Sequence, residues 1–299
     1  MSDFFKTPAP GRRHGWGMNI FEAAREFVRT EARLVERRLF ATVFEGADPA
    51  GVVDALRGYQ NADGGFGHGL EPDKRCPDST ALDVETAFGV LLTAGARDDE
   101  MVRRACDWLQ SVATPEGAVS LTSPVIEGYP RAEHVAEWTY VPGLNPTAGL
   151  VAQLYAMDFE HPWRDQAEAF CQAKLAEGFP EDAHAMHEST EFLAHTPDPD
   201  VAKVRDWLPK LSHYRADAAD PSYGVTPLDF ASTPDSFWRQ LFDDNQINGH
   251  LDRLVADQQA DGGWAITWEP PGTAATLEYR GILTVHALRT LKANGRLAV

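Results

Sequence analysis

The feature that most constrains this chain is a pair of matching strings far apart in the sequence. "QNADGGFGHGLEPD" begins at Gln60 and "QQADGGWAITWEPP" begins at Gln258, and both place Gln, Asp, Gly-Gly, an aromatic residue and Glu-Pro in the same order. Two copies this alike indicate an internal repeat, whose units bury their apolar faces against their neighbours. We expect both double glycines to be architectural, with a positive φ at Gly65 and its counterpart Gly263.

Apolar residues recur at helical spacing along most of the chain. Between Asn19 and Phe44 they lie three, four or seven positions apart, which predicts an amphipathic helix capped by Asn19. The same periodicity predicts further helices over 50–59, 79–93, 101–112, 146–157, 163–175, 183–193, 201–211, 248–259 and 276–293. No comparable set of alternating strand patterns occurs. The chain is therefore predicted to be all-α, a single domain over 1–299 with 1–18 as an extended N-terminal segment.

Charge and composition exclude several classes of function. The chain has 45 acidic and 27 basic residues, a formal net charge of −18, which disfavours nucleic acid and anionic membrane surfaces as partners. No apolar run approaches the length of a signal peptide or a membrane span, so we expect a cytoplasmic protein. The cysteines, Cys76, Cys106 and Cys171, are odd in number and lack CxxC spacing, which predicts reduced thiols. The oligomeric state is left open.

The repeated string also carries a family resemblance. The pattern Q-x-x-D-G-G-[FW], closing one helix and opening the next, resembles the QW motif of the terpenoid cyclase and protein prenyltransferase superfamily. "GGFGHGLEPDKRCPDST" and "LEYRGILTVHALRTL" look most like a widespread group of bacterial proteins with the prenyltransferase-like repeat. The resemblance implies an α/α toroid of about six helical hairpins, with inner and outer helix rings around a cavity. It further implies lyase or isomerase chemistry on a hydrophobic, isoprenoid-type small molecule.

The acid motif of class II terpenoid cyclases, D-x-D-D-T-A, has an altered counterpart here. "LDVETA" resembles the end of that motif, but Val84 stands where the resemblance would place the proton-donating aspartate. Asp83 or Glu85 can take that role if burial raises its pKa.

The metal-binding motifs of the superfamily match this sequence less well than the acid motif does. "DDNQIN" offers Asp243 and Asp244 as a possible magnesium site of the class I type. The D-x-C zinc spacing of protein prenyltransferases does not occur, and His184 and His187 show no third ligand, so we expect no zinc.

Acidic residues follow both repeated turns. Glu71 and Asp73 come after the first double glycine and Glu269 after the second. In a toroid, turns of one type lie at one end, so these acids are expected to converge at a cavity mouth, where pKa values shift. The candidate catalytic residues are Glu71, Asp73, Asp83, Glu85 and Glu269. The candidate substrate-binding residues are Arg75, Trp138, Tyr140, Asn145, Trp264, Trp268, Glu278, Tyr279 and Arg280.

Each of these candidates also has a structural interpretation. The acids can cap helices, Glu278 can pair with Arg280, and the aromatic residues can pack between helices instead of stabilising a cation. The leading hypothesis is a terpenoid-cyclase-like or prenyltransferase-like enzyme that starts a cyclisation or isomerisation with an acid. The alternatives are a noncatalytic ligand-binding or scaffold toroid and a carbohydrate-active α/α toroid enzyme with paired carboxylates.

Overall fold

The computed structural model describes residues 19–297, and the expected extended segment 1–18 lies outside them. The helices are α1 (Ile20–Glu31), α2 (Leu34–Glu45), α3 (Ala50–Arg57), α4 (Ala81–Ala94), α5 (Asp99–Val112), α6 (Leu144–Ala156), α7 (Pro162–Glu177), α8 (Ala183–Leu193), α9 (Val201–Trp207), α10 (Pro227–Phe230), α11 (Asp244–Ala256) and α12 (Thr273–Ala293). Short 3-10 helices are η1 (Pro124–Gly128), η2 (His134–Glu137), η3 (Leu208–Lys210) and η4 (Phe237–Leu241). The described part of the chain is all-helical, with isolated β-bridges in place of strands.

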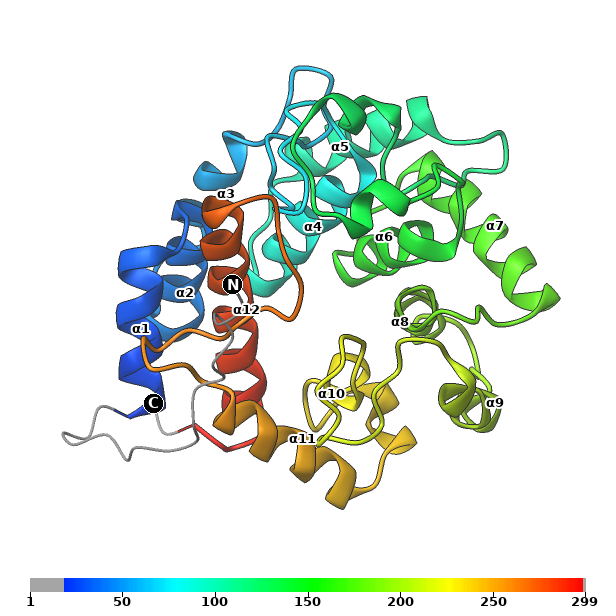
Figure 1. Cartoon of the computed structure of the whole chain (residues 1–299). Helices are drawn as coiled ribbons and strands as arrows, with labels where there is room; N and C mark the ends of the chain where they lie inside the picture. The colour runs from blue at the N-terminus through cyan, green and yellow to red at the C-terminus, as the bar shows by residue number, and fades with distance from the viewer. Residues whose placement is uncertain (1–18, 298–299) are drawn as a thin grey trace, which may run out of the picture.

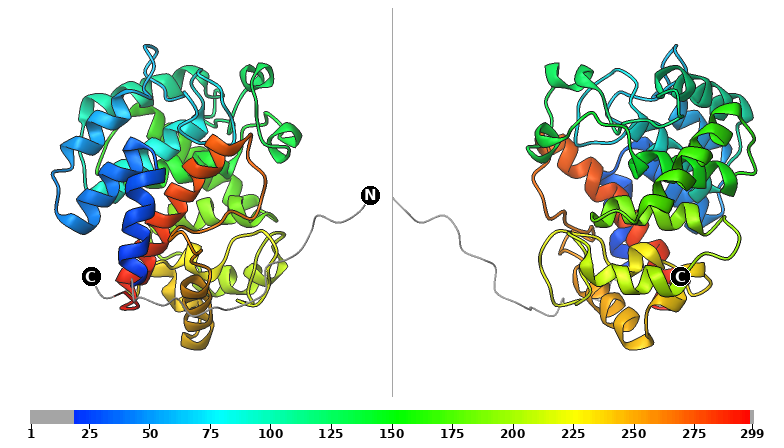
Figure 2. Two further views of the ribbon diagram at one scale, coloured as in Figure 1. Left: turned by 60° about the vertical axis from the view of Figure 1, so that its left-hand side comes forward. Right: turned by 90° about the vertical axis from the view of Figure 1, so that its right-hand side faces the viewer.

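The helices form two concentric rings (Figure 1). The even-numbered helices lie inside, where α2 contacts α4, α4 contacts α6, α6 contacts α8, and α8 contacts α10. α11 bridges α10 and α12, and α12 packs on α1 and α2, which closes the ring between the first and last repeats (Figures 1 and 2). Odd-numbered helices cover the outside, and the apolar core lies between the two rings. The fold is an α/α toroid, as predicted.

The two copies of the repeated turn have the same structure. The side-chain amides of Gln60 and Gln258 each donate to the glycine carbonyl four residues on, at 2.9 Å, and to a carbonyl at the start of the next outer helix. Asp63 and Asp261 each accept from the backbone N–H two residues on. The predicted repeat is therefore a structural unit that ties each outer helix to the next.

The two glycines of each turn have different roles, and the expected position of the positive φ is wrong. Positive φ occurs at Gly64 (99°) and Gly262 (93°), not at Gly65 and Gly263. The second glycine of each pair is required for space: a Cβ on Gly65 would lie 2.5 Å from the Cβ of Ser79.

The N-terminal helix prediction is also wrong in one respect. Asn19 does cap α1, accepting from the Glu22 N–H at 2.8 Å, but the expected single helix over 19–44 is a hairpin of α1 and α2. The break has a tertiary cause, because Arg33 donates to the carbonyls of Gly69 and Leu70. Across residues 19–297, no helix combines the length and the apolar character that crossing a membrane requires.

Candidate functional site

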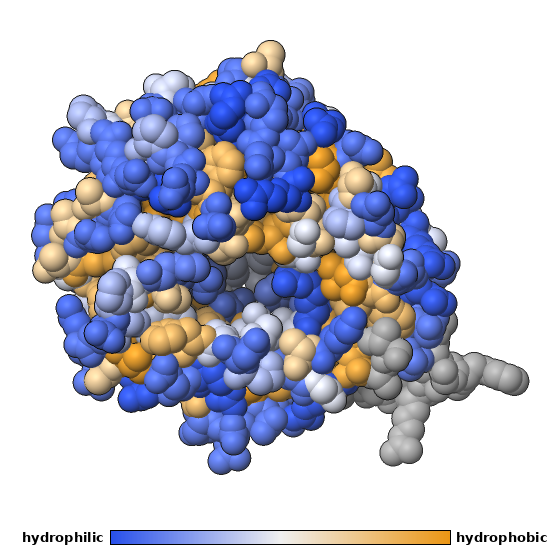
Figure 3. Space-filling view, turned by 180° about the vertical axis from the view of Figure 1, so that it is seen from behind, coloured by the Kyte–Doolittle hydropathy of each residue, from blue (hydrophilic) through white to orange (hydrophobic). Residues whose placement is uncertain are grey.

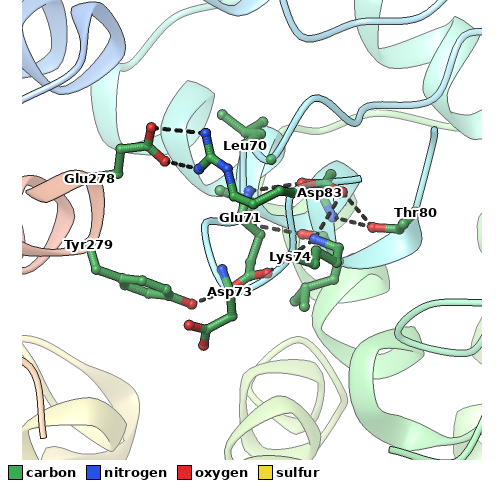
Figure 4. Close-up of polar contacts among 12 residues, drawn as sticks. Leu70, Glu71, Asp73, Lys74, Thr80, Asp83, Glu278 and Tyr279 are labelled. Atoms are coloured by element: carbon green, nitrogen blue, oxygen red, sulfur yellow. Dashed lines mark hydrogen bonds and ion pairs between the residues drawn. The ribbon is translucent and has the colours of Figure 1, made fainter. Parts of the chain in front are cut away.

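The loops that lead from outer to inner helices gather at one end of the ring. One of them joins α3 to α4 and holds Glu71, Asp73 and Arg75. The loop from α11 to α12 carries Trp268 to the same place, and the first turns of α12 carry Glu278 and Tyr279. Residues from the first and last repeats therefore meet here (Figure 4).

A buried lysine lies at the centre of this turn cluster (Figure 4). The Lys74 ammonium has no exposed surface and lies 3.1 Å from Glu71 Oε2 and 2.9 Å from Asp83 Oδ2. Asp83 also accepts from the Glu71 backbone N–H at 2.8 Å and from the Thr80 hydroxyl at 2.6 Å. Burial disfavours the charged ammonium, but the two carboxylates outweigh it and raise the pKa of Lys74. Glu71 and Asp83 thus serve as partners of a cation.

Tyr279 and Trp268 connect this loop to the last repeat. The Tyr279 hydroxyl donates to Glu71 Oε1, and burial together with that carboxylate raises the pKa of the phenol. Trp268 Nε1 donates to Asp73 Oδ1 at 3.0 Å, and His134 Nε2 lies 3.2 Å from Asp73 Oδ2, a contact that raises the pKa of His134. Both acids are buried rather than directed into bulk solvent.

The two arginines of the predicted site have different partners. Arg75 forms a two-pronged ion pair with Glu278 across the closure of the ring. Arg280 pairs instead with Asp261 of the repeated turn and covers the Phe27 ring at 4.6 Å. Glu278 therefore does not pair with Arg280, and Glu269 lies exposed in the α11–α12 loop.

The remaining sequence candidates lie in less distinctive surroundings. Trp264 is buried and donates to the Leu254 carbonyl, which is a packing position. Trp138 contacts His134 edge to face, and the Tyr140 hydroxyl donates to Glu127. Asn145 lies at the start of α6.

Asp243 and Asp244 have ordinary partners. Asp243 caps α11 by accepting from the Gln246 N–H at 2.8 Å, and exposed Asp244 pairs with Arg239. These contacts are those of a helix cap and a surface ion pair. A magnesium site there stays a prediction.

A second acidic group lies on the inner ring, where α4, α6 and α8 meet. The carboxylates of Glu85 and Glu188 both lie against Gly149 of α6, where a Cβ would collide with them. Burial and the adjacent Glu188 raise the pKa of Glu85 well above its usual range. Within residues 19–297, Glu85 Oε1 has no hydrogen-bond donor. A proton held between the two carboxyl groups would supply the missing hydrogen.

His187 extends this pair toward the other side of the ring. Its Nδ1 lies 3.4 Å from Glu188 Oε1 and its Nε2 lies 3.1 Å from the Asp229 carbonyl oxygen. Burial opposes protonation, yet the contact with Glu188 and the nearby carboxylates raise the pKa of His187 to about 9. The protonated His187 ring carries its positive charge next to Glu188.

Asp229 also lines a cavity between α10, α11 and α12. This cavity has a volume of about 410 Å³ and combines apolar walls from Leu228, Leu254 and Leu283 with the Trp268 side chain. A second cavity of about 430 Å³, next to Arg289 and Lys292, shares His286 with the first. The back face of the molecule is hollowed at the centre of the ring (Figure 3). Volumes of this size suit a small organic ligand.

Comparisons with known proteins show the fold. A scan of protein-family models and a search of curated proteins each find no match. Among solved structures, a variant of the type II terpene cyclase MstE from Scytonema, in complex with geranylgeranyl dihydroxybenzoate as substrate, matches with a TM-score of 0.54 and 13% identity. The match covers 93% of this chain and 97% of that one. A second MstE variant with the same substrate gives 0.51 and 14%. The chain has the fold of a terpene cyclase.

Sequence analysis missed Glu188 and Gly149 as members of an acidic site. Glu188 ends the string "HAMHE", in which His184 and His187 were the candidate metal ligands. Nothing in the local sequence distinguishes this glutamate as a candidate acid. The one sequence feature that pointed to this site was the tripeptide Glu85-Thr86-Ala87, which resembles the end of the acid motif of class II terpenoid cyclases. Its partner comes from a helix far along the chain, and only the closed ring brings the two together.

Proposed function

We propose that this protein is a terpene-cyclase-like enzyme that protonates a hydrophobic, isoprenoid-type small molecule inside the ring and so starts a cyclisation or isomerisation. The observation that carries the proposal is the apposition of Glu85 and Glu188 on inner helices, with the pKa of Glu85 raised. A carboxylic acid that stays protonated near neutral pH is a ready proton donor.

Among the candidate acids, Glu85 is the best supported. Glu71 and Asp83 hold the Lys74 ammonium, and Asp73 accepts from Trp268. Ionised carboxylates suit those contacts, whereas the position of Glu85 favours the neutral acid. In this proposal Glu85 supplies the proton. The turn cluster has a structural role, because its ion pairs and hydrogen bonds hold the loops together at one end of the ring.

The raised pKa also constrains the substrate. It extends upward the pH range over which Glu85 holds its proton but makes Glu85 a weaker donor, because the driving force for proton transfer falls as the donor pKa rises. Terminal epoxides and other oxygen-containing isoprenoids are therefore better candidates than a plain alkene. A carbohydrate-active enzyme is less favoured, because its two carboxyl groups stand about 5–10 Å apart, whereas Glu85 and Glu188 are adjacent.

The test is turnover of a panel of farnesyl and geranylgeranyl compounds and their terminal epoxides, followed by chromatography and mass spectrometry. In a cyclisation that takes up one proton and later releases one, the product has the mass of the substrate but a new elution time. In D₂O, a substrate that is protonated at carbon exchanges one hydrogen for one deuterium, so its product is one mass unit heavier. We expect Glu85→Gln to lower turnover by roughly 100-fold or more, since a positioned general acid contributes that much. Asp54→Asn, a substitution on the exposed face of α3, serves as control.

Full activity of Glu85→Gln on a converted substrate would contradict the assignment of the acid. Binding of panel members without conversion by the wild-type protein would favour the noncatalytic ligand-binding alternative.

A further inference from the structure

One cluster apart from the acid pair combines three groups that bind transition metals. Asp182, His184 and His213 offer a carboxylate oxygen and two imidazole nitrogens that all lie within 4.8 Å of one another. Asp182 caps α8, His184 lies in the first turn of that helix, and His213 belongs to the loop between η3 and α10. The sequence showed no partner set for His184, and the fold provides one.

We propose that Asp182, His184 and His213 bind a divalent transition-metal ion of the Zn²⁺ type, with one coordination position left open. Nδ1 of His184 lies 3.3 Å from Asp182 Oδ1, and Nδ1 of His213 lies 3.0 Å from Asp182 Oδ2. In a tetrahedral site with metal–ligand bonds of about 2.1 Å, neighbouring ligand atoms are roughly 3.4 Å apart. The two distances to Asp182 are close to this spacing, and all three ligand atoms lie within 4.8 Å of one another.

The backbone holds the two halves of this site together. The Ser212 N–H donates to the Glu181 carbonyl at 2.8 Å, and the Ala183 N–H donates to the Ser212 carbonyl at 3.0 Å. These bonds fix the His213 loop to the start of α8. The ligands are thus positioned before any ion binds, which lowers the ordering cost of binding.

The conformation of His213 is a second, independent observation. Its φ is 58°, in the left-handed region that few residues other than glycine adopt. Val225 donates its N–H to the His213 carbonyl at 2.8 Å, which holds this conformation and keeps the imidazole against Asp182. Backbone strain of this kind concentrates at functional sites, where the surrounding structure maintains it.

Two of the ligand side chains, His184 and Asp182, also make hydrogen bonds to groups that are not ligands, as metal-binding side chains commonly do. His184 Nε2 lies 2.8 Å from the Tyr223 hydroxyl, whose ring also stacks on the imidazole. When this hydroxyl accepts from Nε2–H, Nδ1 is free to offer its lone pair to a metal ion. Asp182 Oδ1 likewise accepts from the backbone N–H groups of His184 and Ala185. Both ligands are therefore oriented by their second partners.

The site lies at the same end of the ring as the turn cluster. Tyr223 contacts Trp268 edge to face, and Trp268 donates to Asp73. The His184 and His213 side chains are 34% and 57% exposed, so an ion can reach them and the open position can take water or a ligand oxygen. The proposal does not depend on Glu85 or on the proposed function.

The test uses the full-length chain, freed of any affinity tag and stripped with a chelator. We expect calorimetric titration with ZnCl₂ to give one equivalent bound, and CoCl₂ to give the visible absorption of a tetrahedral site. His184→Ala and His213→Asn should each weaken zinc binding at least tenfold; asparagine tolerates the left-handed backbone, so the second variant keeps the loop. Tyr223→Phe keeps the stacked ring but removes the acceptor and should weaken binding about tenfold.

The control is His195→Asn, on a histidine outside the cluster, which should leave zinc affinity unchanged. Unchanged melting of each metal-free variant separates loss of the site from loss of the fold. Failure of the wild-type chain to bind one equivalent would overturn the proposal. So would a zinc affinity that His213→Asn does not change.

Discussion

Two acids on the first turns of α4 have opposite environments although only one residue separates them. Asp83 accepts from Thr80 and contacts the Lys74 ammonium, and Glu85 faces the carboxylate of Glu188. A helix turns by about 100° per residue, so positions two apart point to different surroundings. The sequence offered both as the acid, and only their neighbours separate a cation partner from a proton holder.

Glu85 also makes the stability of the fold depend on pH. Its pKa in the folded protein is raised above the ordinary 4.5, so the folded protein holds a proton that the unfolded chain has released. Stability must then fall as pH rises above about 4.5, by up to about 1.4 kcal/mol per pH unit until the folded pKa is passed. The Glu85→Gln variant has no ionisable group at this position, so its stability does not fall with pH for this reason.

We therefore expect the melting temperature of Glu85→Gln to exceed that of the wild-type protein by a margin that widens between pH 5 and pH 8, measured by circular dichroism. The comparison cancels groups common to both proteins, including His187, whose stabilising protonation is lost as pH rises toward 9. Parallel pH profiles would show that Glu85 ionises normally.

At the scale of elements, the Gln-Asp-Gly-Gly turn was predictable because its chemistry is local. A turn between α5 and α6 has similar geometry: Gly117 has a φ of 92° and its N–H donates to the Thr114 carbonyl. The break between α1 and α2 was not predictable, since it depends on Arg33 reaching a loop far along the chain. The same arginine pairs with Glu36 of α2, which is buried.

The turn also gives a matched pair of glycine substitutions. Gly46 and Gly64 both have positive φ, but a Cβ on Gly46 meets nothing, whereas one on Gly64 would press into the Arg104 carbonyl. Gly46→Ala should cost about 1 kcal/mol from backbone strain alone. Gly64→Ala should cost about 1–3 kcal/mol more, because the α5 backbone must move. Urea unfolding measures both, and equal losses would mean that the turn is not locked to the outer helix.

At the scale of the whole molecule, helical periodicity could not choose between an open solenoid and a closed ring. The motif resemblance favoured the ring, and contacts between distant residues close it. Gln258 donates to the Ile20 carbonyl at 2.8 Å, Tyr279 donates to Glu71, and Arg75 pairs with Glu278. The pairing of Glu85 with Glu188 belongs to this scale too, because no local pattern links α4 to α8.

Closure predicts how the protein unfolds. In an open array each repeat contacts only its neighbours, and the ends can unravel separately. Here the first and last repeats support each other and the core is continuous, so we expect one cooperative transition in which helix loss by circular dichroism and tryptophan fluorescence coincide. The fluorescence reports widely separated regions, since Trp163 is buried on α7, Trp238 in η4 and Trp264 in the last turn. Transitions that separate by several degrees would indicate that the ring opens before the core melts, as in a solenoid.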